Sequence, residues 1–298
     1  MPIRLDQQLR EQIAHRDSNF PISFYHDELE QLPDWSGPLH WHPEFEIATA
    51  VDAALDYQVG KNHLKLEPGD SIFVNGNMLH GIRQINGACP DPMPNIVFAG
   101  ALIAPENSLI YSKYIQPMAT CSTLPFVLFR HDDDACASIH AAIREIYACL
   151  SDQRPCFEMT VQRNLILVFE YITLHFDALP KLEASRVQIS TQIRMQQMLA
   201  FIFANYAKDI TLNEIARSAN VSRSEAGRCF QTYMACSPMD ALIKYRLHMA
   251  HTMLRDSTKS ILEISSACGF HSANYFTRQF HRYYGYTPRS LSNLGKSC

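Results

Sequence analysis

Short apolar and alternating runs, separated by turn residues, predict β-strands in the first third of the chain. Turn signals such as Gly60-Lys61-Asn62 and Pro68-Gly69-Asp70 divide these runs. Short strands with frequent turns are typical of a small β-sandwich or barrel. Between Ser36 and Leu102, the expected strands are Glu44–Val51, Leu55–Val59, His63–Leu66, Ser71–Val74 and Asn95–Leu102.

A helical pattern replaces the strand pattern between Asp133 and Phe176. Apolar residues that recur every three or four positions predict an amphipathic helix, and here they are Ile139, Ile143, Ile146 and Leu150. A second helix, Phe157–Phe176, is apolar on more than one face, as buried helices usually are. Two interpretations stay open, because the second apolar face can pack on the barrel or on another subunit.

The last third of the chain contains an internal repeat, Thr211–Ser222 and Ser260–Ser272. Thr211 and Ser260 are suited to cap a short helix, and Ser222 and Ser272 to cap the next one. Asn220 and Gly269 fall in the intervening turn, where a positive φ is required. The repeat therefore predicts two helix-turn-helix motifs, at about 211–233 and 260–284.

The second helix of each motif is expected to present its outer face to the major groove of DNA. Phe230, Phe276 and Phe280 are expected to point inward, which leaves polar side chains outside. Arg pairs with guanine and Asn with adenine, and the methyl group of Thr contacts thymine. The candidate base-reading residues are Arg223, Ser224, Arg228, Asn274, Tyr275, Thr277 and Arg278, and the candidate phosphate contacts are Lys244, Arg246, Arg282 and Arg289.

Charge is divided unevenly along the chain. From Ile193 to the end there are 13 Lys and Arg against 6 Asp and Glu, a net charge of +7, whereas the remainder has a net charge of −11. A basic end behind an acidic front indicates that only the end meets a polyanion such as nucleic acid. The alternative is a helical bundle whose basic side chains only face water.

The region Gln192–Leu291 resembles the DNA-binding domain of the AraC/XylS-type regulators. The resemblance is carried by the run Ile264–Pro288, with Gly269, Phe270, Tyr275, Phe276, Phe280, Gly285, Thr287 and Pro288 at the family's fixed positions. It implies seven helices in two subdomains joined by one long helix, here Met239–Leu254. It also implies two recognition helices that enter successive major-groove segments, about 34 Å apart.

The first recognition helix departs from the family pattern. Ala226 and Gly227 stand where a bulky apolar and a polar residue are usual, and Glu225 brings a negative charge towards the DNA. Ala235-Cys236 replaces the customary glycine before Ser237-Pro238. Glycine weakens a helix interior by up to about 1 kcal/mol. Base contacts are therefore expected chiefly from the second motif.

The strand region resembles the cupin barrels fused to many regulators of this family. Its segment His40-Trp-His-Pro-Glu-Phe-Glu46, followed by His80, matches the cupin metal-ligand pattern. Three imidazoles and a carboxylate suit iron, manganese, nickel or zinc. In such regulators, however, the same residues often only line an effector pocket or brace the barrel. We therefore assign His40, His42, Glu46 and His80 to an effector pocket and expect no cofactor. Trp41, Phe45 and Phe73 are candidates for ligand stacking or for core packing.

No apolar run reaches the length of a membrane helix, and the first residues are too charged for a signal peptide. The nine cysteines are scattered, with no C-x-x-C pair, which is typical of reduced thiols. We therefore expect a cytoplasmic protein without a membrane partner.

The expected fold is α+β: a cupin-like barrel with dimerisation helices (1–179), a linker (180–190) and an all-α DNA-binding domain (191–298). The expected function is transcription regulation, as a homodimer on double-stranded promoter DNA, with no enzymatic activity. The resemblance favours an activator that responds to a sugar or an organic acid and contacts RNA polymerase. The alternative is a metal-dependent cupin enzyme with an accessory DNA-binding tail.

Overall fold

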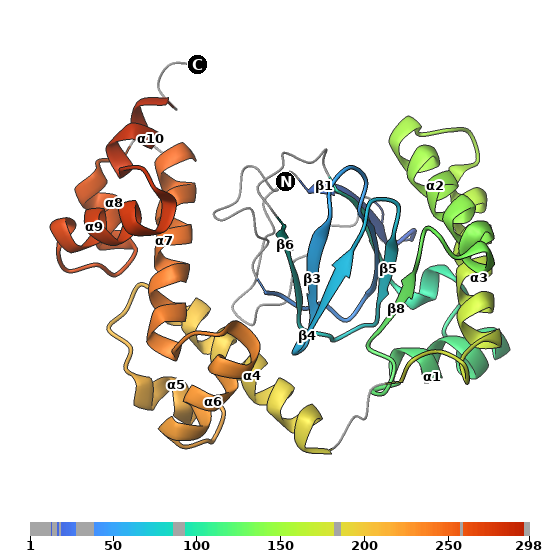
Figure 1. Ribbon diagram of the computed structural model, residues 1–298, viewed down its shortest axis with the longest axis horizontal. Helices are drawn as coiled ribbons and strands as arrows, with labels where there is room; N and C mark the ends of the chain where they lie inside the picture. The colour runs from blue at the N-terminus through green and yellow to red at the C-terminus, as the bar shows by residue number, and fades with distance from the viewer. Residues whose placement is uncertain are drawn as a thin grey trace. The chain divides into compact units, whose positions relative to one another are not determined.

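The chain forms two compact units, which meet in sequence between Ile189 and Ser190. The computed structural model describes residues 13, 17, 19–27, 39–85, 93–181, 186–256 and 259–294. Within them, the first unit combines strands and helices, and the second contains helices and no strand (Figure 1). The α+β fold predicted from the sequence is confirmed.

The ends of the predicted segments lie partly outside this range. Residues 1–12 and 295–298 of the two predicted domains are not described, and neither are residues 182–185 of the predicted linker. The last part of the segment 180–190 is helical, because helix α4 begins at Arg186. The predicted domain boundaries themselves remain predictions.

The first unit is built on two antiparallel sheets. The larger has the strand order β1-β7-β2-β5-β8 and the smaller has the order β4-β3-β6. The strands are β1 (Ile22–Asp27), β2 (Phe45–Thr49), β3 (Leu55–Val59), β4 (Asn62–Leu66), β5 (Ser71–Val74), β6 (His80–Gln84), β7 (Met93–Phe98) and β8 (Phe126–Phe129).

Strand β2 is buried on both faces, which explains its almost continuous apolar sequence. Successive side chains of a strand point to opposite faces of the sheet. The ring of Phe45 packs against Phe169, 5.1 Å away between centroids, on the helix-covered face of the larger sheet. Glu46 points to the other face, where the hydroxyl of Tyr57 from the smaller sheet donates to it. The interior between the two sheets therefore receives the alternate residues of β2.

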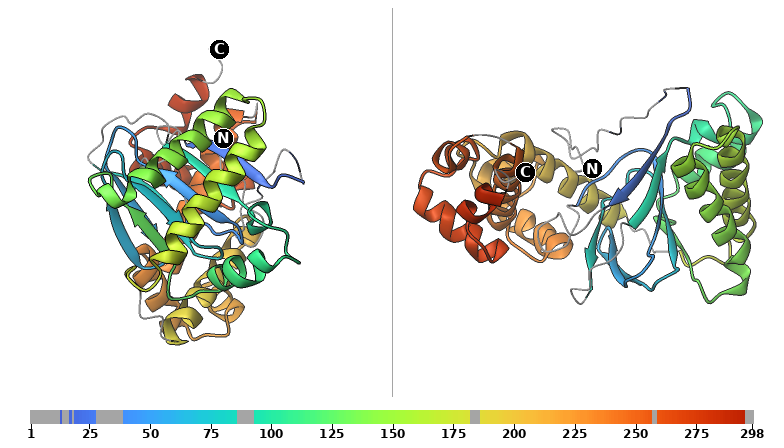
Figure 2. Two further views of the ribbon diagram at one scale, coloured as in Figure 1. Left: turned by 90° about the vertical axis from the view of Figure 1, so that its right-hand side faces the viewer. Right: turned by 90° about the horizontal axis from the view of Figure 1, so that it is seen from above.

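Helices α2 (Ala137–Asp152) and α3 (Phe157–Leu174) pack together and cover the outer face of the larger sheet (Figure 2). As predicted, α2 buries the stripe that contains Ile139, Ile143 and Ile146. One face of α3 is buried, with Val161, Leu165, Val168, Phe169 and Ile172 in the core. Its other face leaves Met159, Ile166, Leu167 and Leu174 exposed.

Several sequence-based expectations need correction. The sequence did not predict strands β1, β6 and β8. Strand β1 lies before the first turn signal, and β6 contains one large apolar residue. Strand β8 is a run of four residues after Pro125. Strand β7 ends at Phe98, and Leu102 lies in a 3-10 helix (Gly100–Leu102). Helix α3 ends at Leu174, two residues before the predicted Phe176. Of the two interpretations left open for Phe45 and Phe73, core packing is the one observed, because both belong to the core on the helix side of the larger sheet.

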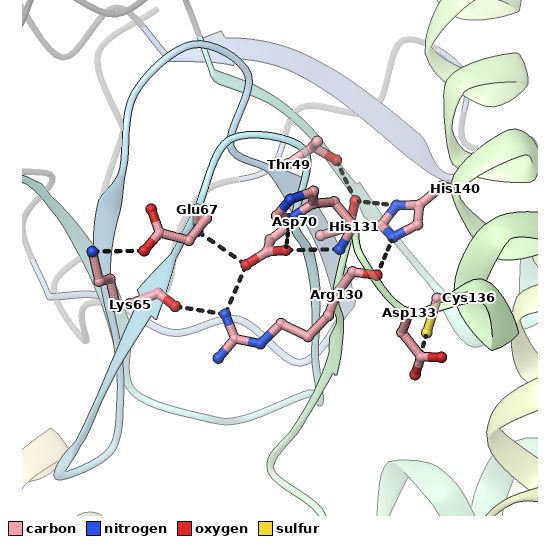
Figure 3. Close-up of polar contacts among 10 residues, drawn as sticks. Thr49, Lys65, Glu67, Asp70, Arg130, His131, Asp133, Cys136 and His140 are labelled. Carbon is pink, nitrogen blue, oxygen red and sulfur yellow. Dashed lines mark hydrogen bonds and ion pairs between the residues drawn. The ribbon is translucent and has the colours of Figure 1, made fainter.

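A buried carboxylate ties the end of β8 to the turn before β5 (Figure 3). Asp70 accepts hydrogen bonds from the backbone N–H of Glu67 and of His131, at 2.9 and 2.8 Å. The guanidinium of Arg130 and Nδ1 of His131 also donate to it, at 2.7 and 2.9 Å. Burial raises the pKa of Asp70, but these hydrogen bonds outweigh it and hold the pKa below its ordinary value. The motif Pro68-Gly69-Asp70 thus serves to close the barrel.

The second unit contains seven helices within the described residues. This number and the long helix α7 agree with the prediction, although α7 extends beyond Met239–Leu254 at both ends. None of the helices in the described ranges combines the length and apolar character needed to cross a bilayer. The helices are α4 (Arg186–Asn205), α5 (Leu212–Ser218), α6 (Arg223–Met234), α7 (Pro238–Asp256), α8 (Ile261–Ala267), α9 (Ala273–Tyr284) and α10 (Pro288–Leu294), while the short α1 (Gln116–Ala119) belongs to the first unit.

Candidate functional site

The first helix-turn-helix is formed by α5 and α6. The N–H of Glu214 donates to Oγ1 of Thr211, and the N–H of Thr211 donates back to the Glu214 carboxylate at 2.8 Å, which makes a capping box. Asn220 takes the turn with φ 55°, and Ser222 caps α6 by accepting the N–H of Glu225. The predicted caps and the left-handed turn residue are confirmed.

The second helix-turn-helix, α8 and α9, repeats this construction. Ser260 and Glu263 form the capping box of α8. Gly269 takes the turn with φ 77°, and Ser272 caps α9 by accepting the N–H of Tyr275 at 3.3 Å. The same capping interactions and the same left-handed turn at both sites explain why the sequence repeat folds into two similar units.

The candidate base-reading residues lie on α6 and α9 and point away from the core. Phe230, Phe276 and Phe280 are fully buried, as predicted, which orients both helices with the opposite face outward. Thr277 is half-buried, and the remaining candidates are exposed: Arg223, Ser224, Arg228, Asn274, Tyr275 and Arg278. The helices therefore present two polar faces, each carrying arginine.

The two recognition helices differ in electrostatics. On α6, Glu225 forms an ion pair with Arg228 and a longer one with Arg194 of α4. On α9, Arg278 carries no acidic partner in the described residues, and its guanidinium lies 5.6 Å from the centre of the Tyr275 ring. Because Glu225 neutralises part of the first helix, the second presents its positive charge more freely to a polyanion.

Arg246, a predicted phosphate contact, has a structural role instead. Its guanidinium donates to the backbone carbonyls of Tyr206 and Lys208, both at 2.7 Å. It also lies 5.9 Å from the centre of the Phe270 ring. Burial lowers the pKa of this guanidinium. The other three predicted phosphate contacts, Lys244, Arg282 and Arg289, are exposed.

A second cluster lies inside the barrel, between the two sheets. Its members are His40, His42, Glu46 and His80, all buried, with ligand atoms within 4.8 Å of one another. Backbone hydrogen bonds in both directions, at 2.9 Å, join His40 to His80. The four residues assigned to one site from the sequence are therefore together in space, although their role as an effector pocket remains a prediction.

Hydrogen bonds orient the cluster in the manner of a metal site. Nδ1 of His42 and of His80 lies 3.1 and 2.7 Å from a backbone carbonyl, so each Nδ1 carries the proton. Nε2 of both rings then faces the carboxylate of Glu46, at 3.1 and 2.9 Å. A lone pair on Nε2 would repel a carboxylate, so a cation, either a proton or a metal ion, must separate them.

Glu46 is ionised despite its burial. Desolvation raises its pKa, but the nearby His80 and His42 outweigh this effect and hold the pKa well below its ordinary value. Tyr57 donates its hydroxyl to the other carboxylate oxygen at 2.7 Å. Sequence reasoning missed Tyr57, although the strand alternation of Leu55–Val59 places its side chain on the interior face. The donor set, with fixed Nδ1 groups and a supported carboxylate, fits a divalent ion such as manganese, iron, nickel or zinc.

Comparisons with known proteins agree with both halves of this description. A helix-turn-helix domain model matches residues 215–293, and a cupin domain model matches residues 28–88. The chain is 25% identical to the uncharacterized HTH-type transcriptional regulator YdeC of Bacillus subtilis, over 97% of this chain and 98% of that protein. It is 22% identical to the melibiose operon regulatory protein of Escherichia coli, over 94% of this chain and 93% of that protein. The regulator GbdR of Pseudomonas aeruginosa is 38% identical over 34% of this chain and 27% of its own length.

These similarities cover the two matched domains and nearly the whole chain. They confirm the resemblance stated from the motifs around Gly269 and around His40. As the sequence resemblance predicted, the chain combines an N-terminal cupin domain with a C-terminal helix-turn-helix domain of the AraC type, and it is similar over nearly its whole length to transcription regulators.

Proposed function

We propose that the protein reads its operator through the exposed faces of α6 and α9, and that a small molecule bound in the barrel controls this binding. The observation that supports base reading is the pair of capped helix-turn-helix units with polar outer faces. The proposed base-reading residues are Arg223, Ser224 and Arg228 on α6, and Asn274, Tyr275, Thr277 and Arg278 on α9.

Substitution of Arg278 tests base reading. If Arg278 holds a guanine, Arg278→Ala weakens binding to the operator by about 1–3 kcal/mol and leaves non-specific binding nearly unchanged. Arg154→Ala, an exposed arginine at the end of α2, is the matched control and should change neither. The measurement is fluorescence anisotropy with operator and scrambled duplexes at two salt concentrations. Equal weakening on both duplexes would assign Arg278 to phosphate.

The barrel cluster is the proposed effector site. Similarity to a regulator named for the melibiose operon supports a sugar or a related organic acid as the effector. A divalent ion would be held by His40, His42, Glu46 and His80, and it would supply a Lewis-acid site for a hydroxyl or carboxylate oxygen of the effector. The protein side of this arrangement is the orientation of the rings by the Glu44 and Met78 carbonyls.

Metal loading is tested by elemental analysis of the full chain and by its thermal shift with each candidate ion. His80→Asn should abolish both the bound ion and the shift. His63→Asn is the control, since His63 is exposed on β4 and pairs with Asp56 outside the cluster. Less than about 0.1 ion per chain after loading would limit the cluster to bracing the barrel and contacting the effector, because a resident metal binds near one equivalent.

The family resemblance supports a proposal for the mode of regulation. We infer an activator that binds promoter DNA as a homodimer in the cytoplasm, contacts RNA polymerase and has no enzymatic activity. Control by ligand requires the effector to favour one arrangement of the dimer over another. Footprinting upstream of the gene and its neighbours, with and without pathway metabolites, tests this mode. Protection that no metabolite alters would contradict ligand control.

A further inference from the structure

The hydroxyl group of Tyr57 reaches from the smaller sheet to a carboxylate on the larger sheet. Tyr57 lies on β3 and Glu46 on β2, which belong to different sheets. Alternate side chains of a strand share one face, and on β3 the buried ones are Leu55, Tyr57 and Val59. Tyr57 is 1% exposed and donates to Oε1 of Glu46 at 2.7 Å. This hydrogen bond therefore joins the two sheets inside the barrel.

Packing alone does not explain a tyrosine at this position. A phenylalanine would fill almost the same volume, and a buried hydroxyl group costs free energy unless it has a partner. The ring of Tyr57 lies nearly parallel to the imidazole of His80, with an interplanar angle of 7° and 6.4 Å between centroids. A phenylalanine would keep this ring contact as well. What distinguishes tyrosine here is the hydrogen bond from its hydroxyl group to Glu46.

The two oxygen atoms of Glu46 face different partners. Oε1 accepts the hydroxyl of Tyr57, whereas Oε2 lies 3.1 Å from Nε2 of His42 and 2.9 Å from Nε2 of His80. A carboxylate group is planar, so a bond that holds Oε1 on one side also fixes the direction of Oε2. The bond is charge-assisted, because its acceptor is a carboxylate, and such bonds are stronger than neutral ones. Tyr57 thereby keeps Oε2 directed at the imidazoles.

This arrangement determines how Glu46 would bind a divalent ion. Carboxylates bind such ions through one oxygen or through both. The imidazoles of His42 and His80 face Oε2, and the hydroxyl group of Tyr57 occupies Oε1. Glu46 is thus prepared to contribute one oxygen, and with His40 the cluster offers four donor atoms. An ion with about six ligands would keep about two positions for water or for an oxygen atom of an effector.

We propose that Tyr57 is a positioning residue, which holds Glu46 as a one-oxygen ligand and so keeps coordination positions of a bound ion open for the effector. The inference deepens the proposed effector site and rests on the proposed binding of a divalent ion there. Without the hydroxyl group, the carboxylate turns and binds through both oxygens, which takes up one of the open positions.

Removal of the hydroxyl group tests this role, with Mn²⁺ as the probe and the full chain as the sample. Loss of a group that orients a metal ligand weakens metal binding by about 10- to 100-fold, and Tyr57→Phe should lose about 10-fold. Isothermal titration calorimetry measures the dissociation constant. Tyr147→Phe is the matched control, because the Tyr147 hydroxyl bonds with Thr49 and with the Ile47 carbonyl outside the cluster. This control should keep the wild-type constant.

The number of water molecules on the bound ion separates positioning from a merely structural role. Water-proton relaxation of the chain saturated with Mn²⁺ reports this number. The wild type should hold about two water molecules on the ion, and Tyr57→Phe about one. A loss of affinity with no change in bound water would reduce Tyr57 to a structural role and overturn the proposal.

Infrared difference spectra of the wild type, ion-loaded minus ion-free, test the binding mode without any substitution. Binding through one oxygen separates the two C–O stretching bands of a carboxylate widely, and binding through both brings the bands closer together. Wide separation in the wild type and narrower separation in Tyr57→Phe are expected. Narrow separation in the wild type would contradict the proposal, whether or not the variant folds.

The outcomes separate this inference from the proposed function. If the wild type binds Mn²⁺ and Tyr57→Phe matches it in affinity and in bound water, the role of Tyr57 is refuted and the proposed ion site stands. A wild-type chain that takes up no Mn²⁺ would overturn the inference too, because Glu46 would then have no ion to bind. Operator binding by the same samples, measured by anisotropy, reports on the DNA-binding function alone.

Discussion

Gly269 is the position where a single methyl group should be most costly. Its φ is 77°, a region in which L-residues lose about 1–2 kcal/mol. A Cβ placed there would lie 2.8 Å from the Tyr206 carbonyl oxygen, 3.0 Å from the Ala207 carbonyl oxygen and 3.0 Å from Cζ of Arg246. Two of these atoms belong to the backbone, so relieving the contacts requires displacement of the segment between α4 and α5. We expect Gly269→Ala to lower the free energy of unfolding of the second unit by about 3 kcal/mol or more.

Gly285 provides a matched control, since its φ is 76° and a Cβ there meets nothing within 4 Å. Gly285→Ala should therefore cost only the backbone term, about 1 kcal/mol. In a domain of this size, about 1 kcal/mol corresponds to roughly 4–8 °C in the melting temperature. The difference between the two variants isolates the cost of close packing.

The two units of the chain can be followed separately. Both tryptophans, Trp35 and Trp41, precede Ser190, so their fluorescence reports on the first unit. Far-UV circular dichroism is dominated by the helices, most of which lie in the second unit. Gly269→Ala should lower the melting temperature measured by circular dichroism and leave the melting temperature measured by fluorescence unchanged. Equal losses in Gly269→Ala and Gly285→Ala would refute the packing argument.

Three further predictions concern other parts of the chain. Gly227→Ala should stabilise the second unit by about 0.5–1 kcal/mol in thermal denaturation, since a Cβ there meets nothing within 4 Å. Glu225→Gln frees Arg228 and should raise affinity for scrambled DNA about 3- to 10-fold with a steeper salt dependence; unchanged anisotropy would contradict this. Asp70→Asn should cost about 3 kcal/mol at neutral pH. Because folding lowers the pKa of Asp70, its ionised carboxylate stabilises the folded state above about pH 4. This stabilisation fades as the pH falls through the pKa of the folded state. The melting temperatures of wild type and variant should therefore converge in acid.

The sequence was most informative where local chemistry alone decides the structure. Caps such as Thr211 and turn residues such as Asn220 act within a few residues, so their pattern predicted both helix-turn-helix motifs. Strand β8 depends on its pairing with β5, and Arg246 depends on two carbonyls nearly 40 residues away, and neither relation leaves a local pattern. The histidine cluster was predicted because the cupin motif encodes it, whereas Tyr57 lies on a different sheet and was missed.

The second DNA-binding motif is held to the first by the short segment between α4 and α5. Arg246 of the long helix binds the carbonyls of Tyr206 and Lys208, and Gly269 lies against the same Tyr206 carbonyl. His271, which makes the second turn one residue longer than the first, forms an exposed ion pair with Asp209. Because the part-buried Arg246 and the close approach of Gly269 both hold this segment in place, we expect the spacing of α6 and α9 to be set before DNA is bound. In the proposed mode of regulation, an effector bound in the barrel would therefore have little means of altering that spacing, and its control would act on how the whole DNA-binding domains of the proposed dimer are presented to the two half-sites.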